Sequence, residues 1–205
     1  MSLVFLNNRA VRSVTAFGSI GTGSMVFIKK LTASSSGTLS FVNGSSDVVL
    51  DSTYKEYLFT FKNIHPSAES RFVFQTSTDS GSSYGVTATT TFFQAYHTED
   101  GSAAALAYVA VEDFAQSTDF IHLGEQVDPS GNDQNSCGYL QLFNPSSTTF
   151  VKHFMSKQSQ NYVSNYLNNP FVAGYFNTTS AIDAVQFKFE SGNIDAGDIC
   201  LYGIL

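Results

Sequence analysis

The chain has 205 residues and a formal net charge of −7, with ten Lys and Arg against seventeen Asp and Glu. Its basic residues never cluster beyond Lys29 and Lys30, so it is poorly suited to neutralise phosphates, which argues against nucleic-acid binding. Charged residues make up 13% of the chain, whereas aromatic residues reach 14% with nineteen Phe and no Trp. This mixture favours β-sheets over solvated helices.

The first 24 residues differ from the rest. Three glycines at 18, 21 and 23 interrupt any periodic pattern, and Arg9 and Arg12 supply two of the ten positive charges. A segment of this kind cannot bury enough apolar surface to fold alone. We expect residues 1–24 to form an extended arm that docks on a partner. The start is too short and lacks the basic residues of a signal peptide, and no apolar run is long enough to span a membrane.

A strand pattern begins at Met25 and continues to the end of the chain. Apolar residues alternate with polar ones, for example in the stripe formed by Tyr57, Phe59 and Phe61. The predicted strands cover residues 25–28, 39–41, 57–61, 72–76, 87–97, 103–111, 119–123, 138–143, 149–155, 171–176, 185–189 and 199–204.

Three segments of this series need comment. Residues 103–111 begin with the best helix formers of the chain, but β-branched and aromatic residues follow, so we predict a strand. Residues 77–84 are dense in turn formers and predict a hairpin-like connection. Residues 158–168 are polar, with Tyr162, Val163, Tyr166 and Leu167 at helical spacing, and fit a single helical turn or a loop equally well.

The end of the chain predicts a terminal hairpin. Val185, Phe187 and Phe189 alternate with polar residues, and residues 191–193 supply Ser-Gly-Asn, which tolerates positive φ. Residues 199–204 then give the return strand. Counting this pair, about a dozen short strands with no sustained helix pattern predict an all-β fold. We expect an antiparallel β-sandwich over residues 25–205, jelly-roll-like, with eight core strands and a few added edge strands.

Motifs that point to catalysis lack their structural context. Gly81-Ser-Ser83-Tyr-Gly85 matches the letters of a nucleophile elbow, but that motif needs a helix after the turn, and residues 86–93 read as a strand. Glu99 and Asp100 are neighbours in a predicted loop and read as a solvated tip rather than a catalytic pair. We therefore expect no catalytic and no cofactor-binding residues.

Metal sites are not expected either. Zinc needs three or four converging ligands, whereas the histidines are scattered singly. The turns at residues 128–133 and 193–198 offer oxygen ligands for calcium but lack the spacing of a known calcium loop, so their acids are interpreted as turn formers. Cys137 and Cys200 are too few for a disulfide framework, and whether they pair stays open. The histidines, interpreted as packed or surface residues, are His65, His97, His122 and His153.

Exposed aromatic residues are the remaining candidates for a binding surface. Tyr84, Tyr96, Tyr162 and Tyr166 lie near predicted turns, where their rings could stack on sugars or contact a partner protein. In a sandwich, however, most aromatic residues belong to the core.

Four segments carry a family resemblance: residues 57–66, 76–84, 138–145 and 187–204, the last containing Gly192-Asn-Ile and ending in Leu201-Tyr-Gly-Ile204. They resemble a family of virion structural proteins from tailed bacteriophages, especially marine ones, whose usual ending this is. Ser80 stands where the family more often has glycine. The resemblance implies a structural protein of the virion with no catalytic residues.

Two roles within a virion fit this sequence. A capsid decoration or cement protein, commonly a homotrimer, would bind the outer capsid shell and clasp the major capsid protein or other virion proteins with its arm. A tail-fibre or receptor-binding carbohydrate-binding module would contact a host-surface glycan, and a polysaccharide-degrading enzyme is a distant third. Because the chain contains no coiled-coil or β-helical shaft, we expect a non-enzymatic decoration protein, made in the host cytoplasm and located in the virion.

Overall fold

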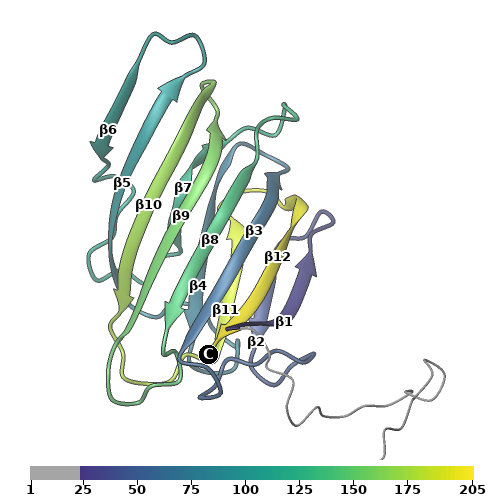
Figure 1. Cartoon of the computed structure of the whole chain (residues 1–205), viewed down its shortest axis with the longest axis vertical. Helices are drawn as coiled ribbons and strands as arrows, with labels where there is room; N and C mark the ends of the chain where they lie inside the picture. Colours follow the sequence, from purple (N-terminus) through teal and green to yellow (C-terminus); the bar gives the residue numbers. More distant parts are fainter. Residues whose placement is uncertain (1–23) are drawn as a thin grey trace, which may run out of the picture.

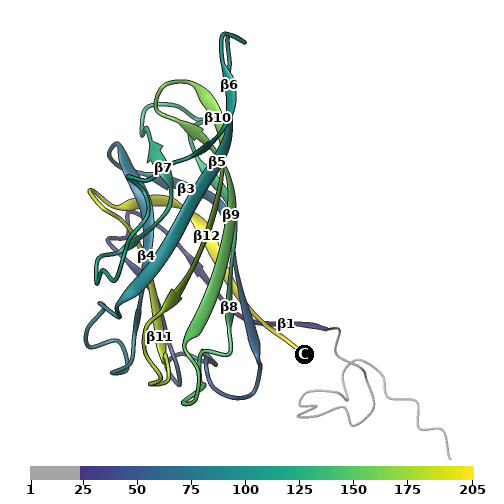
Figure 2. The same cartoon turned by 90° about the vertical axis from the view of Figure 1, so that its left-hand side faces the viewer.

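The computed structural model describes residues 24–205, which form two antiparallel β-sheets packed face to face (Figures 1 and 2). The predicted arm, residues 1–24, lies outside the described residues except for Ser24. The strands are β1 (Met25–Thr32), β2 (Leu39–Val42), β3 (Glu56–Pro66), β4 (Ser70–Ser77), β5 (Ala88–Thr98), β6 (Ala104–Tyr108), β7 (Ile121–Val127), β8 (Ser136–Phe143), β9 (Lys152–Tyr162), β10 (Tyr166–Phe176), β11 (Ala184–Phe189) and β12 (Ile194–Ile204).

The strand order is that of a jelly roll with added strands. The large sheet has the order β1-β12-β3-β8-β9-β10-β5-β6, and the small sheet has the order β2-β11-β4-β7. Within this order β1 pairs with β12, β2 with β11, β3 with β8, and β4 with β7, which is the nested pairing of an antiparallel ribbon folded over into two sheets. The other four strands, β9, β10, β5 and β6, widen the large sheet beyond β8. The predicted antiparallel sandwich of jelly-roll type is therefore confirmed.

Phenylalanine fills the space between the two sheets. Phe59 and Phe61 of β3 point inward from the large sheet, and Phe72 and Phe74 of β4 point inward from the small one. All four side chains are at most 3% exposed, as is Phe187 of β11 between them. The alternating aromatic residues of the sequence are thus the core, as the period of two requires.

The predicted terminal hairpin is wrong in its pairing. The alternation holds, because Ile199 and Leu201 are buried, and Gly192 has φ +72° in the predicted turn. However, β11 pairs with β2 and β4 in the small sheet, whereas β12 pairs with β1 and β3 in the large sheet. The turn between β11 and β12 therefore leads the chain from the small sheet to the large sheet. In this arrangement the apolar face of each strand packs against the opposite sheet.

Two further predictions need correction. Residues 158–168 form neither a helical turn nor a loop, because β9 and β10 run through them as a hairpin whose turn contains Asn165 at φ 56°. Residues 77–84 are no hairpin connection, since β4 and β5 belong to different sheets. Ser80 has φ 60° there, a conformation that favours glycine.

The predicted strand at residues 103–111 is confirmed as β6, with bounds Ala104–Tyr108. It pairs only with β5 and forms one edge of the large sheet. In Figure 1 the β5–β6 hairpin rises beyond the other strands, and β6 lies at the margin of the molecule.

Candidate functional site

One surface of the large sheet faces away from the sandwich and is not covered by any other described element (Figure 2). Cross-strand pairing aligns Tyr139 with Lys157, Lys157 with Phe171, and Phe171 with Phe93, on strands β8, β9, β10 and β5. Met155 lies two residues before Lys157 on the same side of β9. We call these five residues the open face.

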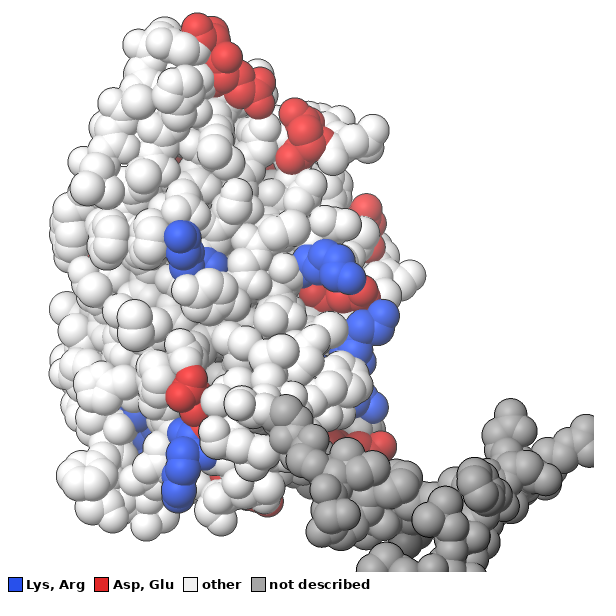
Figure 3. Space-filling view, viewed as in Figure 1, with Lys and Arg blue, Asp and Glu red and all other residues white. Residues whose placement is uncertain are grey.

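The open face is apolar and exposed. Phe93 and Tyr139 are each 40% exposed and Met155 is 54% exposed, although all three lie in the middle of regular strands. A hollow of about 210 Å³ lies among these side chains and Phe171. Figure 3 shows the surrounding surface as a broad field of uncharged side chains, with charged residues sparse at its centre and more frequent toward its upper, right-hand and lower margins.

The rings of the open face stack on one another. Phe93 and Phe171 lie parallel, with their centroids 5.0 Å apart and 1° between their planes. Lys157 Nζ lies 4.8 Å from the centroid of Phe171, on the side away from Phe93 in the strand order. Both faces of the Phe171 ring are thus occupied. Phe171 therefore offers no free ring face on which a sugar could stack.

A second, more polar hollow of about 550 Å³ lies near the end of the same sheet. Its lining includes His97, Glu99, Asp133, Asn161 and Leu167. Asn161 Nδ2 donates a hydrogen bond of 2.8 Å to Glu99 Oε1 and lies 3.5 Å from Asp133 Oδ2. Carboxylate and amide groups beside one apolar side chain offer partners to a hydroxyl-rich ligand.

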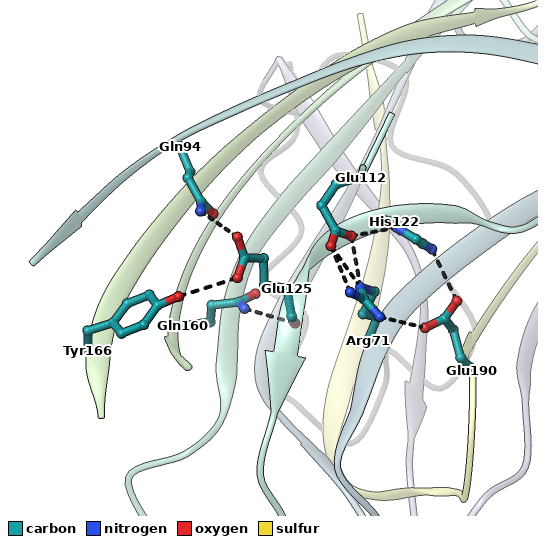
Figure 4. A network of polar contacts seen from close by, with 8 residues as sticks. All are labelled: Arg71, Gln94, Glu112, His122, Glu125, Gln160, Tyr166 and Glu190. Carbon is teal, nitrogen blue, oxygen red and sulfur yellow. Dashed lines mark hydrogen bonds and ion pairs between the residues drawn. The ribbon is translucent and has the colours of Figure 1, made fainter. Parts of the chain in front are cut away.

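An ionic cluster, with Glu112 and His122 buried and Glu190 exposed, joins four parts of the chain (Figure 4). Arg71 of β4 donates two hydrogen bonds of 2.8 Å to the carboxylate of Glu112, which lies in the connection between β6 and β7 and is 3% exposed. His122 of β7 contacts Glu112 through Nδ1 at 2.6 Å and Glu190 through Nε2 at 3.1 Å. The cluster attaches the connection between β6 and β7 to the small sheet.

The charges of this cluster set the pKa of Glu112. Burial alone would raise the pKa of this carboxyl, but the hydrogen bonds and charges of His122 and Arg71 outweigh burial, so the pKa is lowered. Glu112 is therefore ionised at neutral pH and contributes to stability there.

Glu125 of β7 is the opposite case (Figure 4). Its carboxylate accepts hydrogen bonds from Gln94 Nε2 and, at 3.4 Å, from Tyr166 Oη, but no ion pair with a cation is present within residues 24–205. Burial raises the pKa of Glu125, and the charge of Glu112 adds to the effect. Gln94 Oε1 beside it is buried without a hydrogen-bond partner.

We expect Glu125→Gln to stabilise the protein at pH 7, because burial disfavours the ionised carboxylate that the amide replaces. An acid whose folded-state pKa is raised contributes stability at low pH and loses it as the pH rises through that pKa. The neutral amide avoids this loss and can donate to Gln94 Oε1. Urea unfolding at pH 7 and pH 4 checks the prediction: the gain should be present at pH 7 and small at pH 4, and a destabilised variant at pH 7 would contradict it.

No protein-family model, no curated protein and no solved structure matches this chain. The family resemblance of its sequence therefore stays a prediction.

The four tyrosines predicted as binding candidates do not form one surface. Tyr162 and Tyr166 stack with centroids 4.5 Å apart, and Tyr96 lies 5.3 Å from Tyr166. Tyr166 is held by Glu125, and burial raises the pKa of Tyr166. Tyr84 lies elsewhere, in the connection between β4 and β5. None of the four belongs to the open face.

The other singled-out residues fall in ordinary positions. Ser83 donates a hydrogen bond of 2.6 Å to Asp79 Oδ2 within its own turn. Asp128 accepts a hydrogen bond from Ser130 N within its turn, as turn formers do. The prediction of a turn at residues 193–198 is wrong for Asp198, which lies in β12 and accepts a hydrogen bond from Thr32 Oγ1 of the neighbouring strand β1. Over residues 24–205 no group of three or more His, Cys, Asp or Glu side chains is placed to hold a metal ion, and no helix is long and apolar enough to cross a membrane.

The cysteines are both free thiols, and the histidines are separate from one another. Cys137 and Cys200 form no disulfide. Among the histidines, His97 and His153 are exposed, whereas His122 is 8% exposed within the ionic cluster.

The sequence did not reveal the ionic cluster or the open face. Residues 71, 112, 122 and 190 share no motif or spacing, and only the fold brings them together. The open face had one signal in the sequence. In a half-buried strand the residues between the buried ones are usually polar, but here some of them are hydrophobic, such as Phe93 after the buried Phe92 and Met155 after the buried Phe154.

Proposed function

We propose that this chain is a non-enzymatic virion structural protein of a tailed phage, a decoration or cement protein that binds the outer capsid shell through its open face. The composition of that face carries the proposal. Protein interfaces are enriched in aromatic residues and methionine and depleted in charge, and the open face has three aromatic side chains and one methionine around a single lysine. Jelly-roll sandwiches serve in viral capsids and in lectins, which supports the proposal by analogy of fold alone.

The partner in this proposal is the major capsid protein or another virion protein. Residues 1–24 supply a second contact as the arm that clasps neighbouring subunits, and a homotrimer presents three open faces to the shell. The protein is made in the host cytoplasm and functions in the virion.

Binding to particles that lack this protein tests the proposal. Purified chain mixed with such particles should sediment with them at a copy number comparable with that of the capsid subunits. Met155→Glu should weaken binding by about tenfold or more, because it places a charge at the centre of an apolar interface. Its side chain is 54% exposed, so the substitution should leave the fold intact.

Phe150→Glu is the matched control. Phe150 is 70% exposed in the connection between β8 and β9, so the variant makes the same change of charge away from the open face and should bind like the wild type. If only a few copies bound per particle, as expected for a tail protein, the decoration role would be contradicted. Equal binding of both variants would contradict the role of the open face.

A receptor-binding carbohydrate module is the second candidate, favoured by the polar hollow around Glu99 and Asp133. Specific binding on a glycan array, together with stable particles in the absence of the protein, would decide for this candidate.

A further inference from the structure

The edge strands of the two sheets differ in how well they are protected. An exposed edge pairs readily with another strand, and proteins usually prevent this with charged residues, bulges or very short strands. β1 carries Lys29, Lys30 and a bulge after Phe27. β2 has four residues, and β7 carries the charged Glu125.

β6 has five residues, but it has neither a charged residue nor a bulge. Its sequence is Ala-Ala-Leu-Ala-Tyr, and no Asp, Glu, Lys, Arg or Pro occurs in residues 101–111. Leu106 is 74% exposed and Tyr108 is 60% exposed. The strand itself therefore carries no charge, although Tyr108 Oη at its end donates a hydrogen bond to the carboxylate of Asp113.

The hydrogen-bond pattern shows which backbone groups of β6 are free to pair. Thr98 N donates to Ala103 O at 3.0 Å, and Val109 N donates to Phe92 O at 3.1 Å. Because bonded residues alternate along an antiparallel pair, Ala105 and Ala107 also turn their backbone groups toward β5. The N–H and C=O groups of the residues between them, Ala104, Leu106 and Tyr108, therefore point away from the sheet.

We propose that β6 pairs antiparallel with β6 of a second copy of this chain, so that the two large sheets become one continuous sheet across a twofold axis at Leu106. This register places Leu106 against Leu106 of the second copy and Ala104 against Tyr108 of the second copy, a small side chain facing a large one. The free N–H and C=O groups of all three residues then bond across the axis, as an isologous interface requires.

The surroundings of β6 leave room for this contact. β6 lies at the margin of the molecule in Figure 1, and Figure 2 shows the β5–β6 hairpin standing clear of the small sheet. The side chains of Leu106 and Tyr108 lie on the same side of the sheet as Phe93, so pairing extends the apolar surface of the open face into the second copy. The pairing is a twofold contact and stands independently of the role in the virion and of the proposed homotrimer.

Disulfide trapping tests the register. In a chain with Cys137→Ser and Cys200→Ser, Leu106→Cys should form a disulfide-linked dimer under mild oxidation, because directly opposed residues of a bonded pair lie about 5.5 Å apart at Cα, within disulfide range. Leu167→Cys is the control, since it is 54% exposed on β10, two strands inside the edge. Dimer on a non-reducing gel from Leu106→Cys alone supports the pairing, whereas equal yields from both variants overturn it.

Sedimentation of the full chain gives a second readout. The wild type should associate with rising concentration, and Leu106→Lys should weaken association by on the order of tenfold, because it sets two like charges face to face. Phe150→Lys makes the same charge change away from the edge and should associate like the wild type. A wild type that stays monomeric at every concentration, or a Leu106→Lys variant that associates normally, would overturn the proposal.

Discussion

Replacing Phe187 by alanine is expected to lower the free energy of unfolding by about 3–5 kcal/mol. The side chain is fully buried, and its ring centroid lies 5.3 Å from those of Phe59 and Phe61 and 5.9 Å from that of Phe72. These rings come from both sheets, so the substitution opens a cavity at the centre of the sandwich. The surrounding rings cannot close this cavity, because side chains on rigid strands relax only partly.

Urea unfolding measures this loss as a lower midpoint with an unchanged slope, and thermal unfolding should show a fall in Tm on the order of 10 °C. Phe150→Ala is the control, because Phe150 is 70% exposed and should change stability by less than about 0.5 kcal/mol. A loss below about 1 kcal/mol in Phe187→Ala would mean that this ring does not hold the two sheets together.

The importance of Phe187 for the core follows from the sequence, whereas its partners do not. Alternation in residues 185–189 predicts which side chains are buried, and Phe187 and Phe189 are indeed at most 2% exposed. The same pattern is compatible with pairing to any antiparallel neighbour, which is why the terminal hairpin was a wrong prediction. Pairing is decided by contacts between residues far apart in the chain, such as Phe187 with Leu39.

The candidate surfaces were less predictable than the core. Tyr139 and Phe171 read as strand residues, and only the strand order shows that they share the uncovered side of one sheet. The lack of charge in residues 101–111 was visible, but its meaning depends on β6 lying at an edge. The sequence shows which strands lack charged residues, whereas only the fold shows which strands lie at the edge of a sheet.

Replacing Arg71 by methionine is expected to cost about 3–5 kcal/mol, because it leaves the buried carboxylate of Glu112 without its main cation. Glu112 is 3% exposed and receives two bonds of 2.8 Å from Arg71. The connection that Glu112 holds leads directly from β6, so the variant should also speed hydrogen exchange of the β6 amides relative to those of β3. Chemical unfolding and amide exchange at pH 7 check both effects.

The matched control is Lys30→Met, which breaks an exposed pair. Lys30 Nζ lies 3.4 Å from Asp198 Oδ2, and its side chain is 49% exposed, so the loss should stay below about 1 kcal/mol. Similar losses of unfolding free energy in Arg71→Met and Lys30→Met would contradict the argument that burial makes the Arg71–Glu112 pair important for stability.

The pH dependence separates the charge of the cluster from its packing. Because the folded-state pKa of Glu112 is lowered, its contribution to stability is fully present above the usual value of about 4.5 and is lost as the pH falls through the folded-state pKa. The destabilisation caused by Glu112→Gln should therefore be constant near neutral pH and shrink in acid. Glu125→Gln should show a gain near neutral pH that shrinks in acid, so two carboxyl groups on neighbouring parts of one fold give opposite signs. If the loss of unfolding free energy caused by Glu112→Gln did not change with pH, the cluster would stabilise the fold through its packing rather than through its charge.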